Sequence, residues 1–132
     1  MSKKKILIVE DDADVRLGYH ILLKANQYET VFAADSLSAV SEARKCNPDL
    51  IILDLGLPAG DGFVVLERFR AHITLALIPV IVVSGRDVHG NKERALKAGA
   101  KAYVQTPWND HELLAIIGQL LGQPEPALFR RS

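Results

Sequence analysis

Short apolar runs alternate along the chain with longer segments in which apolar positions recur at helical spacing. The apolar runs have the length of strands and cover residues 5–9, about 28–33, 49–53, 79–83 and 101–105. The helical patterns fill the gaps, at residues 13–25, 36–46, 62–72, 88–98 and 110–121. Runs that are apolar on both faces are typical of buried parallel strands, and right-handed crossovers place helices on both faces of such a sheet. We therefore predict an α/β, doubly wound fold with five parallel strands and five helices.

Polar residues at the predicted boundaries support this division. Asp35 stands where a side chain can cap the second helix, and Asn47 with the following proline ends it. Gly99 has the place of a glycine at a helix C-terminus. Asn109, followed three residues later by Glu112, is typical of a capping box before the last helix.

Composition favours one small globular domain. The chain has 132 residues, of which 48% are hydrophobic, and its 16 basic and 16 acidic side chains give a net charge of +0. No general positive field attracts nucleic acid or an anionic membrane. The single cysteine, Cys46, excludes an internal disulfide, and no apolar run approaches the length of a membrane span. We expect a cytoplasmic domain over residues 1–121, with 122–132 as a linker or disordered tail.

Acidic residues stop two of the predicted strands abruptly. The run 6–9 leads into Glu10 and Asp11, and the run 50–53 leads into Asp54. The carboxyl ends of parallel strands share one edge of a sheet, where open α/β folds keep their ligand sites. Carboxylates gathered there repel one another unless a cation lies between them. A divalent metal site at this edge is therefore predicted.

Five segments, in order, resemble the response-regulator receiver domain of two-component signalling. They are ILIVEDD at 6–12, LIILDLGLPAGDGF at 50–63, PVIVVSGRD at 79–87, ALKAGAKAYV at 95–104 and ELL at 112–114. The resemblance covers about residues 3–121. It implies a flavodoxin-like sheet with strand order 2-1-3-4-5, and a regulatory phosphoacceptor domain that is not an enzyme in its own right.

The same resemblance assigns roles to the acids. Asp54 is the expected acceptor of a phosphoryl group from a phosphohistidine on a sensor histidine kinase or phosphotransfer protein. Asp11 and Asp54 are expected to bind Mg²⁺ directly, Glu10 through water, and Gly56 through its backbone carbonyl. Mg²⁺ keeps several waters, so two or three protein oxygens suffice. Asp12 is better explained as the cap of the first helix.

Other positions of the family pattern fall on the last two strands. Ser84 has the place of a hydroxyl that binds the phosphoryl oxygen, and Gly85 lets the backbone approach it. Tyr103 matches the switch aromatic, although simple strand packing explains it equally well. The family lysine before a proline is replaced by Thr106. Losing a charged hydrogen bond there forfeits roughly 1.5–3 kcal/mol of phospho-state stabilisation.

Two consequences of this replacement stay open in the sequence. Lys3, Lys4 or Lys5 could supply the missing charge, or the domain could be a degenerate receiver that acts as a phosphorylation-independent interaction module. An aspartate-nucleophile phosphatase is a poor alternative, because Gly56 stands where that class needs a second acid. Trp108, the only tryptophan, is expected beside the pocket.

Partners follow from the family's usual signalling face, which corresponds to residues 88–121. The resemblance implies that a downstream output domain or protein binds there, and that a homodimer would form through the same face. Leu114 and Ile117 either form an apolar partner surface or belong to a deeper core. No helix-turn-helix segment is present in the sequence, so direct binding of nucleic acid is not expected.

Overall fold

The computed structural model describes residues 3–57, 62–85 and 88–122. Its strands are β1 (Lys5–Val9), β2 (Glu29–Ala33), β3 (Leu50–Asp54), β4 (Val80–Ser84) and β5 (Ala102–Gln105). Its helices are α1 (Ala13–Ala25), α2 (Ser36–Cys46), α3 (Gly62–Ala71), α4 (Val88–Lys97) and α5 (Asp110–Leu120). A short 3₁₀ helix, η1 (Leu75–Leu77), lies between α3 and β4 and was not predicted.

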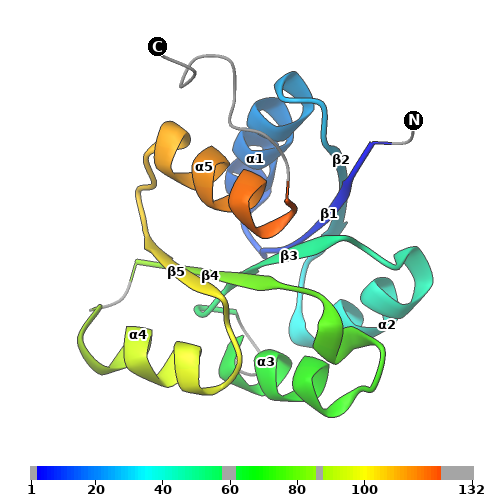
Figure 1. Ribbon diagram of the computed structural model, residues 1–132, viewed down its shortest axis with the longest axis vertical. Coiled ribbons are helices and arrows are strands. Elements are labelled where there is room, and N and C mark those ends of the chain that lie inside the picture. The colour runs from blue at the N-terminus through cyan, green and yellow to red at the C-terminus, as the bar shows by residue number, and fades with distance from the viewer. Residues whose placement is uncertain (1–2, 58–61, 86–87, 123–132) are drawn as a thin grey trace.

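The strands form one parallel sheet in the order β2-β1-β3-β4-β5, which confirms the predicted topology. Figure 1 shows α1 and α5 on one face of the sheet and α2, α3 and α4 on the other. The chain therefore reverses its winding direction between β1 and β3. In doubly wound folds, a crevice opens at this position, at the carboxyl ends of the strands.

Two apolar cores hold these layers together. One contains Leu7, Leu53 and Val82 with the inner side chains of α2, α3 and α4. The other contains Ile8 and Ile52 with side chains from α1 and α5. Successive strand residues thus enter opposite cores, which is why these strands carry uninterrupted apolar runs. Each fully buried aliphatic side chain stabilises the fold by roughly 1.5–3 kcal/mol.

The α5 helix decides between the two interpretations of its apolar face. Leu114 is 7% exposed and Ile117 is fully buried, and both belong to the core beneath α1 and α5. The deeper core is confirmed, and the alternative of an apolar partner surface built on these two residues is wrong. Both interpretations rest on the same spacing of apolar positions in the sequence. Only the packing of α1 against α5 shows which of the two is correct.

Local polar contacts set the helix ends as predicted. Asp35 accepts a hydrogen bond from the backbone N–H of Ser38 at 2.8 Å, and Asn109 accepts one from Glu112 at 3.0 Å. Gly99 has a φ of +111°, a conformation that side chains with a Cβ rarely adopt. In the described part of the chain, every helix is too short or too polar to cross a bilayer. The predicted tail, apart from Gly122, lies outside the described residues.

Candidate functional site

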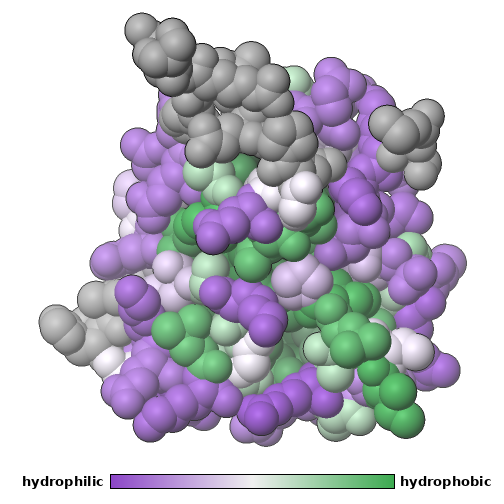
Figure 2. All heavy atoms as spheres, viewed as in Figure 1, coloured by the Kyte–Doolittle hydropathy of each residue, from purple (hydrophilic) through white to green (hydrophobic). Residues whose placement is uncertain are grey.

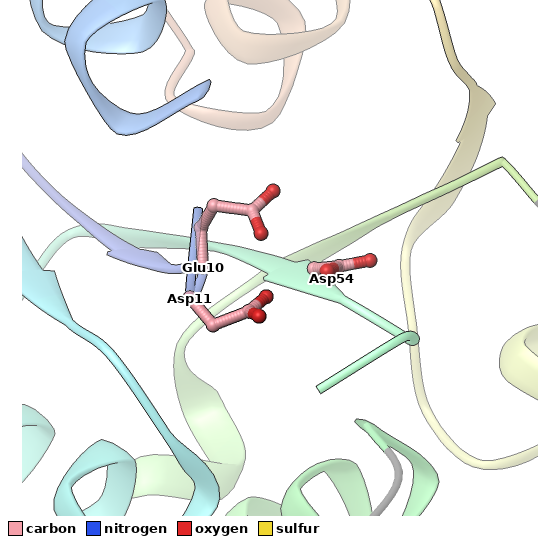
Figure 3. Close-up of side chains that lie close together, drawn as sticks. All are labelled: Glu10, Asp11 and Asp54. Carbon is pink, nitrogen blue, oxygen red and sulfur yellow. The ribbon is translucent and has the colours of Figure 1, made fainter. Parts of the chain in front are cut away.

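Three carboxylates meet where β1 and β3 end. The two strands pair in parallel with Val9 opposite Leu53, so the residues that follow each strand reach the same edge. Oxygen atoms of Glu10, Asp11 and Asp54 all lie within 4.8 Å of one another. Figure 3 shows the three side chains directed into a common space, two from the end of β1 and one from the end of β3. The predicted acid cluster is thus present.

The cluster carries more negative charge than the described protein groups neutralise. Glu10 is only 8% exposed, and its burial, the charge of Asp54 and hydrogen bonding to Asp54 raise the pKa of its carboxyl from 4.5 to about 8. Asp54 is half-buried and Asp11 is exposed, so solvent reaches both. Oxygen ligands that share excess negative charge at an open edge fit Mg²⁺, which prefers oxygen and retains water.

Hydrogen bonds from the chain around the cluster hold its loop in place. Arg16, on α1, donates from Nη1 to the backbone carbonyls of Glu10 and Asp11 at 2.8 and 3.1 Å. Asp12 caps α1, as predicted, by accepting from the N–H groups of Asp14 and Val15. Arg16 was not predicted as a site residue, because an arginine in the first turn and a half of a helix gives no sequence signal for a loop contact.

The acids line a pocket of about 550 Å³ that also includes Thr106 and Trp108. The Trp108 ring stacks on Tyr19 with 4.2 Å between ring centroids, and its Nε1 donates to Asp110 at 2.9 Å. The expected position of Trp108 beside the pocket is confirmed. Tyr19 was missed, since a tyrosine within an amphipathic helix is indistinguishable in sequence from ordinary core. Among the described residues that line this pocket there is no lysine or arginine.

The other predicted site residues are within the described chain but do not line this pocket. Gly56 donates its backbone N–H to Asp54 Oδ1 at 3.0 Å. Ser84 ends β4 and is 1% exposed. A Cβ added to Gly85 would lie 3.0 Å from Thr106 Oγ1, so Gly85 leaves room for that hydroxyl. Tyr103 packs partly buried against the core of α3 and α4, and its buried hydroxyl has no hydrogen-bond partner among the described residues.

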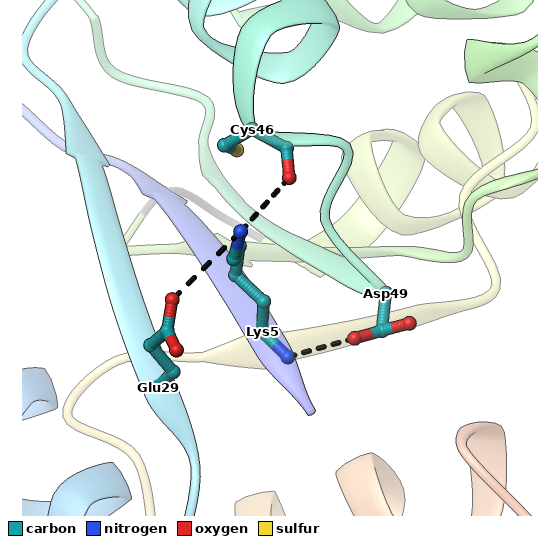
Figure 4. A network of polar contacts seen from close by, with 4 residues as sticks. All are labelled: Lys5, Glu29, Cys46 and Asp49. Atoms are coloured by element: carbon teal, nitrogen blue, oxygen red, sulfur yellow. Dashed lines mark hydrogen bonds and ion pairs between the residues drawn. The ribbon is translucent and has the colours of Figure 1, made fainter. Parts of the chain in front are cut away.

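Lys5 does not replace the family lysine. It stands at the start of β1, the opposite end from the acids, where its Nζ donates to the Cys46 carbonyl at 3.1 Å. The same ammonium lies 3.8 Å from Glu29, and the Lys5 backbone N–H donates to Asp49 (Figure 4). Lys3 and Lys4 precede it at the same end. The suggestion that this lysine run supplies the missing charge is wrong, because a strand of five residues spans roughly 13 Å.

The fold and the acid cluster define a class of signalling domain. The family model of the response regulator receiver domain matches residues 6–118, and the chain belongs to this family. Members are regulatory phosphoacceptor domains of two-component systems. The match confirms the resemblance predicted from the five sequence segments.

Curated relatives include proteins of two lengths. The chain is 32% identical over 123 residues to the phosphate regulon transcriptional regulatory protein PhoB of Escherichia coli (strain K12), covering 93% of this chain and 54% of PhoB. It is 33% identical over 119 residues to the polar-differentiation response regulator DivK of Brucella ovis, covering 90% of this chain and 97% of DivK. The chain therefore spans about half the length of PhoB and nearly all of DivK.

Solved structures agree with this assignment. The receiver domain of the sensor histidine kinase PA1611 from Pseudomonas aeruginosa PAO1, solved with a magnesium ion in its active-site cleft, has a TM-score of 0.84 at 28% identity, covering 92% of this chain and all of that one. The BeF₃-activated N-terminal receiver domain of Klebsiella pneumoniae RstA has a TM-score of 0.84 at 27% identity, covering 91% and 100%.

Proposed function

We propose that this domain accepts a phosphoryl group on Asp54 from the phosphohistidine of a sensor histidine kinase or phosphotransfer protein, and that this changes its binding to an output domain or protein. The observation that carries the proposal is the convergence of Glu10, Asp11 and Asp54 within 4.8 Å at the carboxyl edge of the sheet. Family membership supports the same chemistry. A cytoplasmic location remains a prediction that accords with these partners.

The geometry of Asp54 supports its proposed role as the acceptor. Its carboxylate is half-buried at the end of β3, and the Gly56 N–H that donates to Oδ1 at 3.0 Å orients it. In the reaction, a carboxylate oxygen of Asp54 forms a bond to phosphorus while the phosphorus–nitrogen bond to the donor histidine breaks. The electron pair of that bond returns to the imidazole ring.

The acids are also the residues that would hold Mg²⁺. Asp11 and Asp54 offer the accessible carboxylate oxygens, and Glu10 offers a buried one behind them. When bound, Mg²⁺ supplies the positive charge that neutralises the carboxylates and the incoming phosphoryl oxygens. The pKa of Glu10 is raised first by burial and second by the charge of Asp54, and only this second contribution reflects negative charge that a bound cation would offset. The family's backbone carbonyl at Gly56 completes the proposed ligand set.

The remaining proposed roles belong to β4 and β5. Ser84 and Gly85 are proposed to receive the phosphoryl oxygens, and Tyr103 to respond to their movement. Its hydroxyl is buried without a hydrogen-bond partner among the described residues, and a new position that gave it a partner would be favoured. Thr106 offers a neutral hydroxyl next to Gly85 where the family lysine would offer an ammonium.

Trp108 gives a direct test, because it lines the pocket and stacks on Tyr19. Mg²⁺ and then beryllofluoride, a phosphoryl mimic, are titrated while its fluorescence is followed, with Asp54→Asn as the control. We expect a saturable change that the variant loses. In parallel, phosphoramidate serves as a phosphorus–nitrogen donor, and intact mass spectrometry should detect one phosphoryl group in the native protein and none in the variant.

The second candidate function is a phosphorylation-independent interaction module. The observation that favours it is the absence of lysine and arginine among the described residues of the pocket. A flat fluorescence titration together with an unmodified Asp54 would exclude the phosphoacceptor function and favour this one. Binding of Mg²⁺ and modification of Asp54 would exclude it.

A further inference from the structure

A second hollow lies at the opposite end of the sheet from the acids, between α3, η1 and α4. It has a volume of about 490 Å³. Its lining combines polar groups with the edges of apolar side chains, which are the nearly buried Leu66 and Phe69 of α3 and Leu75 of η1 and the partly exposed Leu96 of α4. We call this the α3–α4 groove. It lies on the side of α4 that faces α3, away from the α5 side of the family's usual signalling face.

The surface around this groove is the most exposed apolar part of the described chain. Ile73 and Leu77 are 89% and 84% exposed, the highest values among its large hydrophobic side chains, and they flank the η1 residues that line the groove. Leu96, which lines it, is 41% exposed. Figure 2 shows apolar residues gathered over the segment that joins α3 to β4, at the lower right of the view. Exposed apolar groups beside a concavity are typical of a binding surface.

Positive charge surrounds the groove. Arg70, Lys97 and Lys101 line it, and Arg70 lies across it, with Nη1 donating to the Lys97 carbonyl at 2.9 Å. Lys97 also pairs with Glu93 at 3.1 Å, but both side chains are more than 70% exposed, and such pairs contribute little. The described residues 62–85 and 88–101 contain six basic and two acidic side chains, a net charge of +4 in a chain whose total is +0.

We propose that the α3–α4 groove binds an acidic amphipathic segment of a partner protein. An aliphatic or aromatic side chain of the segment packs against the apolar side chains of the lining, while its carboxylates face Arg70, Lys97 and Lys101. Charge complementarity selects an acidic partner. The concave shape selects a peptide over a lipid surface, since a bilayer does not fill a hollow of this volume. Two copies of the groove facing each other would bring like charges together, which disfavours a symmetric dimer here.

The probe is a short synthetic peptide with leucines and a tryptophan on one helical face and glutamates on the other. It is titrated into the ¹⁵N-labelled full chain and followed by chemical-shift changes. A second peptide replaces every glutamate by lysine, and a third replaces every leucine and the tryptophan by serine. We expect shifts at groove residues such as Leu96 and Lys101 with the first peptide only, weakening as salt increases.

Matched charge reversals locate the contact. Lys101→Glu should weaken binding of the acidic peptide roughly tenfold and create binding to the lysine peptide, because one attractive contact becomes repulsive. Lys24→Glu, the same change on an exposed position of α1, should leave both affinities unaltered. Circular dichroism and the melting temperature check that both variants fold. Asp54→Asn should bind the acidic peptide like the native chain, which separates this inference from the proposed phosphoacceptor function.

Three results would overturn the inference. The first is the absence of groove shifts with the acidic peptide at low salt, or equal losses in Lys101→Glu and Lys24→Glu. The second is binding to phosphatidylglycerol vesicles without binding to the peptide, which would assign the surface to a membrane. The third is concentration-dependent sedimentation that Lys101→Glu abolishes, which would assign it to the acidic edge of a second copy.

Discussion

Removing one charge from the acid cluster should stabilise the metal-free domain at neutral and alkaline pH. The change is Glu10→Gln, which keeps the size and hydrogen-bonding capacity of the side chain. Glu10 is 8% exposed, and its carboxylate oxygen lies within 4.8 Å of carboxylate oxygens of Asp11 and Asp54. Ionising Glu10 would leave a buried charge poorly solvated and close to the negative charge of Asp54, so the native state holds this proton more tightly than the unfolded chain does.

The size and sign of the effect follow from the pKa of Glu10, which rises from 4.5 to about 8 on folding. Between these values the native state binds a proton that the unfolded state has released, so the free energy of unfolding falls as the pH rises. The slope approaches about 1.4 kcal/mol per pH unit for one proton. The full shift sets a ceiling of about 5 kcal/mol above pH 8, and the penalty disappears below pH 4.5.

Urea denaturation at a series of pH values, with a chelator present, measures this directly. The native domain should lose stability from about pH 5 to pH 8, and Glu10→Gln should lack that slope. Mg²⁺ should flatten the slope of the native domain, and its apparent affinity should rise with pH as Glu10 releases its proton. Glu67→Gln, the same change on the exposed face of α3, is the control. If Glu10→Gln and the native domain show the same pH dependence without metal, the reasoning about the cluster is refuted.

Three further changes test other parts of the site. Thr106→Lys should tighten the binding of beryllofluoride, measured by the fluorescence titration, roughly 10- to 150-fold, as expected for 1.5–3 kcal/mol, and an isosteric Thr106→Val should not. Gly62→Ala should destabilise the domain by at least about 1–3 kcal/mol in urea denaturation, because the new Cβ would lie 2.6 Å from a backbone oxygen of β3, whereas Gly56→Ala meets only an ordinary 3.5 Å contact. Tyr19→Leu should remove the stack with Trp108, lower the free energy of unfolding by about 0.5–1.5 kcal/mol beyond the change in buried area, and alter the fluorescence of that tryptophan.

The alternation of patterns along the chain was sufficient to predict the strands, the helices and the doubly wound class, while the strand order came from the resemblance to receiver domains. Each strand and helix lies within one residue of its predicted bounds, because runs such as 50–53 are buried on both faces and leave no second assignment. The η1 turn was missed, since three residues within a loop rich in apolar side chains give no periodicity. For a related reason, the sequence did not decide whether Leu114 is buried in the core or exposed to a partner. A strip of apolar positions indicates that one face of a helix is covered. It does not indicate whether the rest of the domain or a partner protein covers that face.

The acid cluster could be predicted for a topological reason, and its supports could not. Parallel strands that end in carboxylates must bring them to one edge, so Glu10, Asp11 and Asp54 converge in any fold of this class. Arg16 and Tyr19 act through side chains that reach across from a helix, and their direction depends on packing. The lysine run at 3–5 was misjudged because charge was considered without the direction of β1.

On the proposed function, accepting a phosphoryl group and transmitting its effect depend on different strands. Glu10 and Asp11 follow β1 and Asp54 ends β3, while Ser84 ends β4, Tyr103 lies within β5 and Thr106 follows it. A neutral hydroxyl at Thr106 removes no acceptor and no ligand. It does weaken the interaction between the phosphorylated Asp54 and β5. The equilibrium between the inactive and active conformations shifts only by the free energy that such an interaction adds to one of them. We therefore expect this domain to signal to a partner that contacts the phosphorylated pocket directly. A partner that depends on a distant rearrangement of α4 and β5 would respond less to phosphorylation.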